Sequence, residues 1–351
     1  MFWIWCGFVV FVLLLLALDL GVFHRKDHVI KTREALTWTG VWIAVALLFS
    51  IFIYFGYEHR WMGMGQQVDW IDGTHNGGWA AVVKYLTGYV IEKSLSVDNI
   101  FVMAVLFSYF AVPAMYQHRV LFWGILGAIA MRGVMIALGA QLVKYHWVIW
   151  VFGAFLIFTG LKMMFTRGEG SHDPGKNPVT RAVRKLVPVT EEYHGHLFIV
   201  RRAGRLMLTP LALALVLVET TDLVFAVDSI PAIFAITADP FLVFTSNVFA
   251  ILGLRSLYFA LSGMMDRFRY LKVSLAVVLI VVGVKMVTAK YLKAYLGEHF
   301  NLYLLAGVFA ILGVGVVASL RKPRSTGGSP MTDRFHKQSA PATNNSTSFI
   351  R

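Results

Sequence analysis

The sequence predicts an all-α, polytopic membrane protein with about nine transmembrane helices, six of which form two inverted three-helix repeats. Three observations support this prediction. Hydrophobic residues make up 58% of the 351 residues and the mean hydropathy is +0.67, whereas soluble domains are about 45–50% apolar. The excess lies in continuous runs, each close to the roughly 20 residues that a spanning helix needs. Two of these runs contain similar clusters of acidic residues.

The apolar runs are continuous rather than alternating, which favours helices over the strands of a membrane barrel. The first run lacks a basic leader and an A-x-A-like cleavage site, so we expect a helix there and not a signal peptide. In order, the runs lie near residues 2–23, 36–57, 79–110, 119–142, 147–166, 206–237, 241–264, 271–289 and 302–320.

These runs divide the chain into six segments. We expect two N-terminal helices and an outward-facing loop in 1–78, the first repeat in 79–166 and a basic cytoplasmic loop in 167–205. The second repeat then occupies 206–290 and the last transmembrane helix 291–320. The tail 321–351 is rich in Ser, Thr, Gly, Pro and Asn, a composition typical of disordered segments.

The net charge of +13 follows the predicted topology. If the chain alternates across the membrane, 22 of the 32 Lys and Arg residues fall on one side, eight of them in 167–205. Cytoplasmic loops carry such an excess, so the N-terminus is predicted outside and the C-terminus in the cytoplasm. The basic charge is therefore assigned to topology, with the lipid bilayer as partner and no nucleic acid.

The two acidic runs are related by an internal repeat. Aligning Asp98 with Asp228 places Glu92 on Asp222 and Asn99 on Ser229. Downstream of them, at a common offset of 123 positions, Arg132 falls on Arg255 and Lys162 on Lys285. Each copy thus holds an acidic helix, a helix with an internal Arg and a helix ending in Gly-x-Lys-Met. Because three helices is an odd number, the copies have opposite orientations, as in transporters whose sites lie at the repeat interface near the midplane.

Carboxylates inside membrane helices indicate function, because an ionised side chain at the bilayer centre costs at least about 2.5–3.5 kcal/mol. Oxygen ligands without sulfur or imidazole suit Mg²⁺, Ca²⁺ or Mn²⁺, and they do not distinguish these ions. The predicted metal ligands are Glu92, Asp98, Asn99, Glu219, Asp222 and Asp228. Possible accessory residues are Asp19, Thr220, Thr221 and Ser229.

Two other interpretations remain open. Clustered carboxylates can relay protons, so proton coupling is possible. Alternatively, Lys93, Arg132 and Arg255 pair with the acids, and we expect these three basic residues to support the site in either case. Residues six apart on a helix are separated by about 120°, so Glu92 and Asp98 cannot both face one point on a straight helix.

Redox chemistry has little basis in the sequence. Cys6 is the single cysteine, and the 11 histidines lie in predicted loops or at helix edges. An internal disulfide and a Cys-x-x-Cys centre are thus excluded, and we expect no enzyme activity and no cofactor.

The acidic motifs Glu92-Lys-Ser-Leu-Ser-Val-Asp98-Asn99 and Glu219-Thr-Thr-Asp222-Leu-Val-Phe-Ala-Val-Asp228-Ser-Ile-Pro231 resemble those of the TerC (tellurium-resistance) family of integral membrane proteins. The stretch Leu18-Asp19-Leu-Gly-Val-Phe-His24-Arg25-Lys26 is similar to the Alx-like branch. The resemblance covers roughly residues 1–320.

The resemblance implies a bacterial inner-membrane protein involved in metal-ion homeostasis, chiefly manganese(II) export, with manganese(II) as transported substrate. It also implies that the six predicted ligands are the family's acidic motif residues. An alternative is a non-transporting membrane stress or assembly factor, in line with the family's tellurite-resistance and redox-modulator labels. Coupling ion, oligomeric state and protein partners are not given by the sequence.

Overall fold

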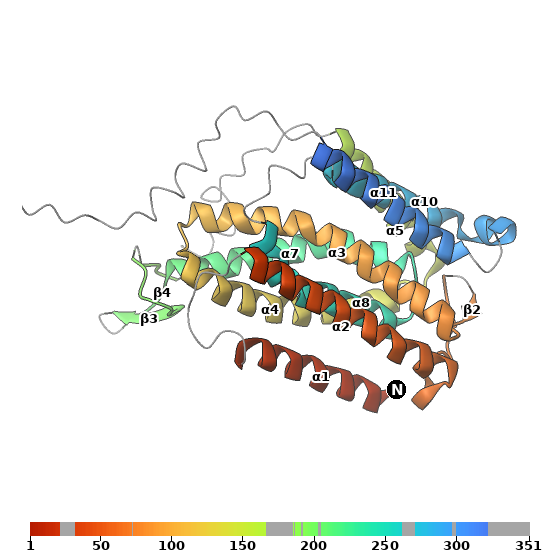
Figure 1. Ribbon diagram of the computed structural model, residues 1–351, viewed down its shortest axis with the longest axis horizontal. Coiled ribbons are helices and arrows are strands. Elements are labelled where there is room, and N and C mark those ends of the chain that lie inside the picture. Colours follow the sequence, from red (N-terminus) through yellow and green to blue (C-terminus); the bar gives the residue numbers. More distant parts are fainter. Residues whose placement is uncertain are drawn as a thin grey trace, which may run out of the picture.

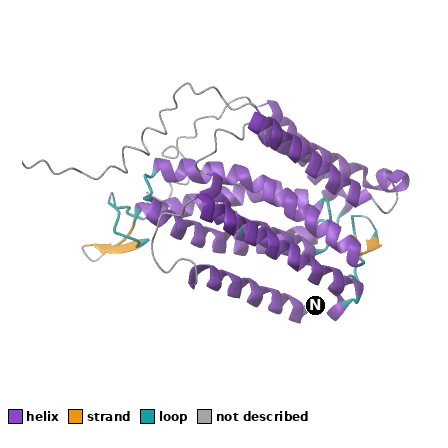
Figure 2. Ribbon diagram, viewed as in Figure 1, coloured by secondary structure: helices purple, strands orange, loops and turns teal. Residues whose placement is uncertain are grey.

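The computed structural model describes residues 1–21, 32–71, 73–165, 185, 187–190, 192–202, 205–261, 271–296 and 300–321. Its long helices run side by side, roughly along the long axis of the molecule (Figures 1 and 2). The helices are α1 (Phe2–Gly21), α2 (Thr32–Glu58), α3 (Gly78–Tyr109), α4 (Ala114–Leu142), α5 (His146–Phe165), α7 (Pro210–Phe234), α8 (Pro240–Leu252), α9 (Leu254–Leu261), α10 (Leu271–Leu296) and α11 (Phe300–Arg321). A short 3₁₀ helix, η1, spans Trp61–Gly63.

The prediction of an all-α membrane protein is confirmed. Within the described residues, eight spans are long and apolar enough to cross a membrane, with α8 and α9 counted together as Pro240–Leu261. Helix α3, at 32 residues, is also long enough to cross a membrane and makes the ninth such helix. It differs because it contains four charged residues, Lys84, Glu92, Lys93 and Asp98, so charge and not length separates it from the others.

Two helix starts at opposite ends of the molecule show why the chain turns where it does. The Thr209 side chain caps α7 by accepting a hydrogen bond from the Ala212 amide at 3.3 Å. Asp239 caps α8 in the same way, accepting from the Phe241 amide at 3.0 Å. Each cap is followed by a proline at the first helical position, where its missing N–H costs nothing.

The middle of the molecule is built from α3, α4, α7 and α8. Helix α3 packs on α7 and α8, and α4 also packs on α7 and α8. The most extensive helix pairing joins α5 to α10, and α11 packs on α10 and α3. Helix α1 lies at one edge in Figure 1, with α5, α10 and α11 at the other.

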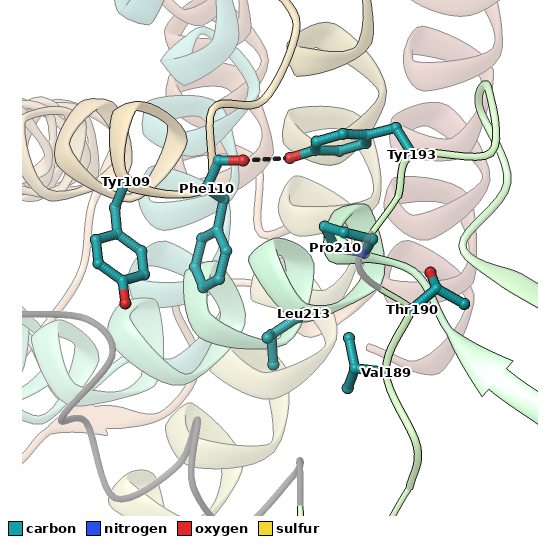
Figure 3. A pocket seen from close by; sticks show the side chains of 7 residues that line it. All are labelled: Tyr109, Phe110, Val189, Thr190, Tyr193, Pro210 and Leu213. Atoms are coloured by element: carbon teal, nitrogen blue, oxygen red, sulfur yellow. Dashed lines mark hydrogen bonds between the residues drawn. The ribbon is translucent and has the colours of Figure 1, made fainter.

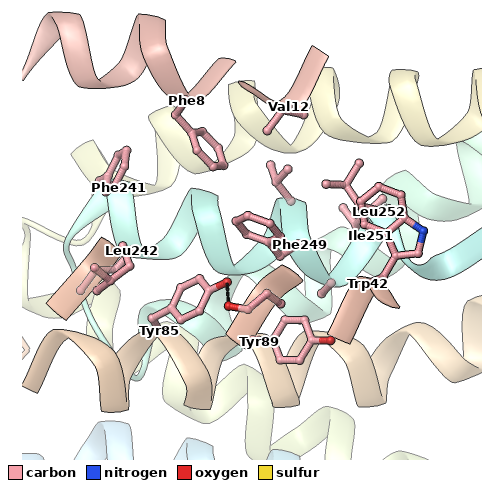
Figure 4. Packing of buried hydrophobic residues seen from close by; sticks show 14 of the residues in the cluster. Phe8, Val12, Trp42, Tyr85, Tyr89, Phe241, Leu242, Phe249, Ile251 and Leu252 are labelled. Carbon is pink, nitrogen blue, oxygen red and sulfur yellow. Dashed lines mark hydrogen bonds between the residues drawn. The ribbon is translucent and has the colours of Figure 1, made fainter. Parts of the chain in front are cut away.

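Aromatic side chains join α1 and α2 to the middle of the molecule. Phe8 and Val12 of α1 point towards Phe249 of α8 (Figure 4). The rings of Phe49 in α2 and Phe249 have centroids 4.7 Å apart. This cluster attaches the N-terminal helices to α8 through apolar packing.

The sequence predicts one helix over 241–264, but the structure has two, separated at Gly253. A Cβ added to Gly253 would lie 2.6 Å from the Nζ atom of Lys93 and 3.1 Å from the Cβ atom of Trp42, so a larger residue there would displace the end of the lysine side chain. Lys93 donates to the carbonyl oxygen of Ala250 at 3.1 Å. The lysine thus satisfies a carbonyl in the last turn of α8, where intrahelical partners run out.

Two antiparallel hairpins are additional to the predicted helices. Strands β1 (Val68–Asp69) and β2 (Thr74–His75) lie between α2 and α3, and β3 (Ile199–Arg202) and β4 (Arg205–Leu208) precede α7. Residues 167–184 of the predicted basic loop, and residues 322–351 of the predicted disordered tail, lie outside the described residues.

Candidate functional site

A cavity of about 410 Å³ lies among α3, α4, α5, α7 and α10. Its polar lining comes from all five helices: Glu92, Asp98, Asn99, Arg132, Thr159, Lys162, Asp228, Ser229 and Lys272. Leu95, Met163, Phe225 and Leu279 supply the apolar part. Lys162 and Lys272 are exposed, in the last turn of α5 and the first turn of α10, so they mark the rim.

Arg132 of α4 is buried between the two acidic helices and binds a carboxylate from each. Its Nη1 atom donates to Glu92 of α3. Its Nε and Nη2 atoms donate to the two carboxylate oxygens of Asp222 of α7, at 3.3 and 3.1 Å. Two parallel bonds of this kind fix the geometry as well as the charge. Asn247 of α8 and Ser229 accept further bonds from Nη1, at 2.9 and 3.3 Å.

Several oxygens beside Arg132 are left with unused acceptor capacity. Asn99 donates from Nδ2 to Asp222 at 3.1 Å. Its own Oδ1 atom is buried without a hydrogen-bond partner, and so is Oε2 of Glu92. Buried polar atoms nearly always have a hydrogen-bond partner, so these two acceptors are available to a ligand in the cavity. Both oxygens belong to residues that line the cavity.

Asp98 and Asp228 lie in the cavity and outside the Arg132 network. Both side chains are partly buried, on α3 and α7 respectively. Thr159 of α5 donates to Oδ1 of Asp228 at 3.5 Å. The four acids at equivalent repeat positions therefore separate into two pairs: Glu92 and Asp222 meet at Arg132, whereas Asp98 and Asp228 face the cavity.

Three predicted residues of the second acidic run lie differently. The Glu219 carboxylate packs against Gly127 of α4, so closely that an added Cβ would overlap with Oε1. Its Oε2 atom is buried without a hydrogen-bond partner. Thr220 and Thr221 donate to the backbone oxygens of Val216 and Leu217, each at 2.7 Å. None of the three is among the residues lining the cavity.

The predicted supporting pairs are only partly brought together. Arg132 binds two of the acids, as described, but Arg255 of α9 donates to Asp19 of α1 at 2.5 Å. Asp19 is thereby placed at the contact between α1 and α9, away from the cavity lining. The hydrogen bond of Lys93 goes to the Ala250 carbonyl. Within the part of the chain that the structure describes, no three Asp, Glu, His or Cys residues are grouped closely enough to hold a metal ion.

Sequence reasoning missed Thr159, Asn247 and Lys272 as residues of this site. Asn247 is fully buried on the run 241–264, in which the repeat alignment singled out only Arg255. Lys162 carried a signal, because it is repeated as Lys285, but its position near a helix end suggested only that its ammonium group reached the surface. Lys285 is instead buried and donates to the Ala235 carbonyl at the end of α7.

A second cavity, of about 600 Å³, lies where α3 ends and α7 begins (Figure 3). Tyr109, Phe110, Tyr193 and Leu213 are among its lining residues. The Tyr193 hydroxyl donates to the Phe110 carbonyl at 2.5 Å, and burial raises the pKa of this phenol to about 12. This cavity contains no carboxylate among the residues that line it, so the acidic cavity is the better candidate for a cation.

A sequence model described as "Integral membrane protein TerC family" matches residues 77–326. The chain belongs to the TerC family. The match covers both acidic helices, Arg132 and every cavity-lining residue, but it begins after the β1–β2 hairpin.

Curated relatives cover nearly the whole chain. A Myxococcus xanthus protein named "Uncharacterized membrane protein STKORF319" is 49% identical over 92% of this chain and 93% of its own length. Proteins named "Putative membrane-bound redox modulator Alx" are 40% identical in Photorhabdus laumondii, over 90% of this chain and 94% of the relative, and 44% identical in Escherichia coli K12, over 82% and 86%. No solved structure matches the chain.

Proposed function

We propose that this TerC protein exports divalent metal ions, foremost manganese(II), across the bacterial inner membrane through the cavity lined by Asp98 and Asp228. The observation that supports this proposal is that Asp98, Asp228 and two residues with unsatisfied acceptor oxygens, Glu92 and Asn99, line one cavity among the helices. Carboxylates and amide oxygens are the ligands that hard divalent cations prefer. The protein acts as a transporter, without enzyme activity or resident cofactor.

The charges assign different roles to the two acid pairs. Arg132 offsets much of the charge of Glu92 and Asp222, so these acids chiefly hold α3, α4 and α7 together. Asp98 and Asp228 then supply the anionic ligands, with the free oxygens of Glu92 and Asn99 beside them. Glu219 and Asp222 remain part of the proposed acidic path on α7, at the Gly127 contact and the Arg132 network.

The inverted-repeat arrangement is part of this proposal, and helix packing supports it. Equivalent helices form reciprocal pairs, because α3 packs on α8 as α4 packs on α7. The α5–α10 crossing has the same property. An added Cβ would lie 3.2 Å from the Gly283 oxygen at Gly153 and 2.8 Å from the Ala276 oxygen at Gly160. Exchanging each residue for its equivalent at offset 123 converts one contact into the other.

The side of the membrane from which the cation enters follows from the position of the cavity's rim. Lys162 and Lys272 lie at the end of the molecule where α5 ends and α10 begins, and the positive-inside rule assigns that end to the cytoplasm. The proposed orientation has the N-terminus outside and the C-terminus in the cytoplasm. The cation enters from the cytoplasm and leaves when the repeats rock against each other.

Uptake of radioactive Mn²⁺ into inverted membrane vesicles tests the proposal. We expect wild-type protein to support uptake, and Asp98→Asn and Asp228→Asn each to abolish it at equal abundance. Glu58→Gln, which changes an exposed carboxylate at the end of α2, is the matched control and should retain uptake. Competition with Mg²⁺ and Ca²⁺ reports selectivity. Wild-type uptake in either aspartate variant, at equal abundance, would contradict the proposed site.

The alternative is a non-transporting stress or assembly factor, and the redox-modulator name of the relatives favours it. A factor acting through partner contacts would tolerate Asp98→Asn and Asp228→Asn, provided the fold is preserved. A thiol-based role would require Cys6, the single cysteine. Retained manganese tolerance in Cys6→Ser cells, together with its loss in Asp98→Asn cells, favours transport over either alternative.

A further inference from the structure

The end of the molecule remote from Lys162 and Lys272 is closed by a second buried polar cluster. Asp69 of β1 is 2% exposed and Lys84 of α3 is 1% exposed. The Lys84 ammonium donates to Oδ2 of Asp69 at 2.8 Å and to Oδ1 of Asn76 at 2.6 Å. The hydroxyl of Thr237 and the amide of Ala238 also donate to Asp69, at 2.5 and 2.9 Å.

These bonds connect parts of the chain that belong to different repeats. Lys84 lies in the first turns of α3, the opening helix of the first repeat. Thr237 and Ala238 form the connection between α7 and α8, inside the second repeat. Asp69 precedes both and bridges them. Tyr57 of α2 adds a parallel tie, donating to Asp239 at the start of α8 at 2.8 Å.

Apolar packing lies between this cluster and the acidic cavity. Ile233 and Phe234, in the last turns of α7, are fully buried. An added Cβ at Gly139 of α4 would lie 2.5 Å from the Phe234 ring, so the ring closes directly onto the α4 backbone. Asp228 and Ser229 are thus the last residues of α7 that line the acidic cavity, and the part of α7 that follows them is tightly packed.

We propose that Asp69, bound to Lys84 and Thr237, is the latch of an outer gate that separates when the cation leaves on the far side. The inference rests on the proposed transport function, since a moving pair of repeats must break every bond that joins them at the closed end. Asp69 suits this role because one carboxylate accepts from both repeats at once. When Asp69 is released, water can reach both the carboxylate and the Lys84 ammonium, and this hydration offsets the cost of separating the two charges.

The proposed latch includes a residue, Asp69, that lies outside the region matched by the family model. That region begins at residue 77, after Asp69 and Asn76. Lys84 and Thr237 lie inside it, so the family's helices supply two of the contacts and the β1–β2 hairpin supplies the carboxylate between them.

Thiol labelling tests the gate without requiring metal. The reporter is Leu95→Cys, which lines the acidic cavity, in a Cys6→Ser background. A membrane-impermeant maleimide is added either to the side that the β1–β2 hairpin faces or to the opposite side. We expect the unaltered latch to give slow labelling from the hairpin side and fast labelling from the opposite side.

The test variant is Asp69→Asn combined with Lys84→Met, which removes both buried charges together. Because charge-assisted bonds are stronger than neutral ones, their loss should speed hairpin-side labelling by about tenfold or more. Thr237→Val keeps the ion pair and should give a smaller increase. Glu58→Gln is the matched control, since Glu58 accepts from the Gly78 amide at 3.0 Å and this bond does not reach the second repeat.

Labelling from the opposite side verifies that each variant keeps its cavity. If the double variant does not fold, Thr237→Val alone carries the test. Unchanged hairpin-side labelling in the folded latch variants overturns the gate. Faster hairpin-side labelling of the latch variants, combined with no Mn²⁺ uptake by the unaltered protein, supports the gate and overturns the proposed function, so the two failures are distinguishable.

Discussion

At the scale of single residues, Arg132 decides how the acids can be used. It is 2% exposed and binds Glu92 and Asp222 from two different helices. Removing one partner of a buried ion pair is costly because a charge is left without compensation. The same guanidinium orients Asn247 and Ser229, so one side chain organises four helices around the cavity.

Arg132→Gln should therefore lower the free energy of unfolding by about 3–5 kcal/mol. Adding Glu92→Gln and Asp222→Asn should recover much of this loss, because no buried charge then lacks a partner. Reversible unfolding in mixed detergent micelles measures all three proteins. Arg205→Gln, at an exposed position of β4, is the control and should change little. Equal stability of Arg132→Gln and wild type would mean that the pairs contribute nothing.

Asp69 should make stability depend on pH in the acidic range. Burial alone would raise the pKa of its carboxyl group, but the Lys84 ammonium and the hydrogen bonds from Lys84, Thr237 and Ala238 outweigh burial and hold it below its ordinary value. Asp69 thus stabilises the fold above the unfolded pKa of about 3.9, and this contribution is lost as pH falls through the lower folded value.

The measurement is the difference in stability between wild type and Asp69→Asn/Lys84→Met from pH 7 down to pH 3. The comparison of the two proteins is needed because burial raises the pKa of neighbouring Asp239, whose titration changes stability with pH in the opposite direction. We expect the wild-type advantage to be constant near neutral pH and to shrink below about pH 4. An advantage that persists unchanged to pH 3 would contradict the assignment.

Residue spacing predicted part of this site. The six-residue separation of Glu92 from Asp98 implies that they point in different directions. In the structure Glu92 binds Arg132 and Asp98 does not, although both residues line the same cavity. The partner of Arg255 was not predictable in this way. Asp19 is distant in sequence, and its contact depends on how α1 packs against α9.

At the scale of elements, the α5–α10 crossing depends on glycine. A Cβ at Gly283 would lie 2.9 Å from the Gly153 oxygen and 3.0 Å from the Ile157 amide nitrogen. Both are backbone atoms, which cannot turn aside as the end of a side chain can. Small residues at such positions let helix backbones approach closely within a membrane.

Gly283→Ala should therefore destabilise the protein by about 1–3 kcal/mol, the usual cost of overpacking. Gly307→Ala and Gly313→Ala in α11 are the controls, because no atom lies within 4 Å of an added Cβ at either position. Thermal unfolding in detergent compares the three. A Gly283→Ala protein as stable as the α11 controls would show that the crossing can widen freely.

The apolar runs located most ends of the long helices to within five residues, but α10 continues to Leu296, beyond the predicted end of its run at 289. The break at Gly253 was not predicted, because the run 241–264 is apolar throughout and Lys93, which occupies the space beside it, is remote in sequence. Hairpins β3–β4 and β1–β2 were also missed, since they lie in polar connections where no hydrophobic period indicates strands.

At the scale of the whole molecule, charge distribution leads to a topology that can be tested. In a Cys6→Ser background, Gln67→Cys in the connection between α2 and α3 should react with an impermeant reagent on intact spheroplasts. His196→Cys, before β3, should react only after permeabilisation. Both positions are exposed, so access and not burial decides the result. The reverse pattern would invert the proposed orientation and the direction of transport.

The order of synthesis gives the Arg132 network one more consequence. Glu92 and Arg132 lie on consecutive helices, so the α3–α4 hairpin contains both members of this buried ion pair before α7 is synthesised. Asp222 follows 90 residues after Arg132, on α7, and accepts hydrogen bonds from the Nε and Nη2 atoms of the same guanidinium. A chain that stops after α5 therefore carries an arginine whose charge is balanced, whereas α7 made alone has no such partner. The first half can serve as an insertion template for the second, and the reverse order is disfavoured by charge.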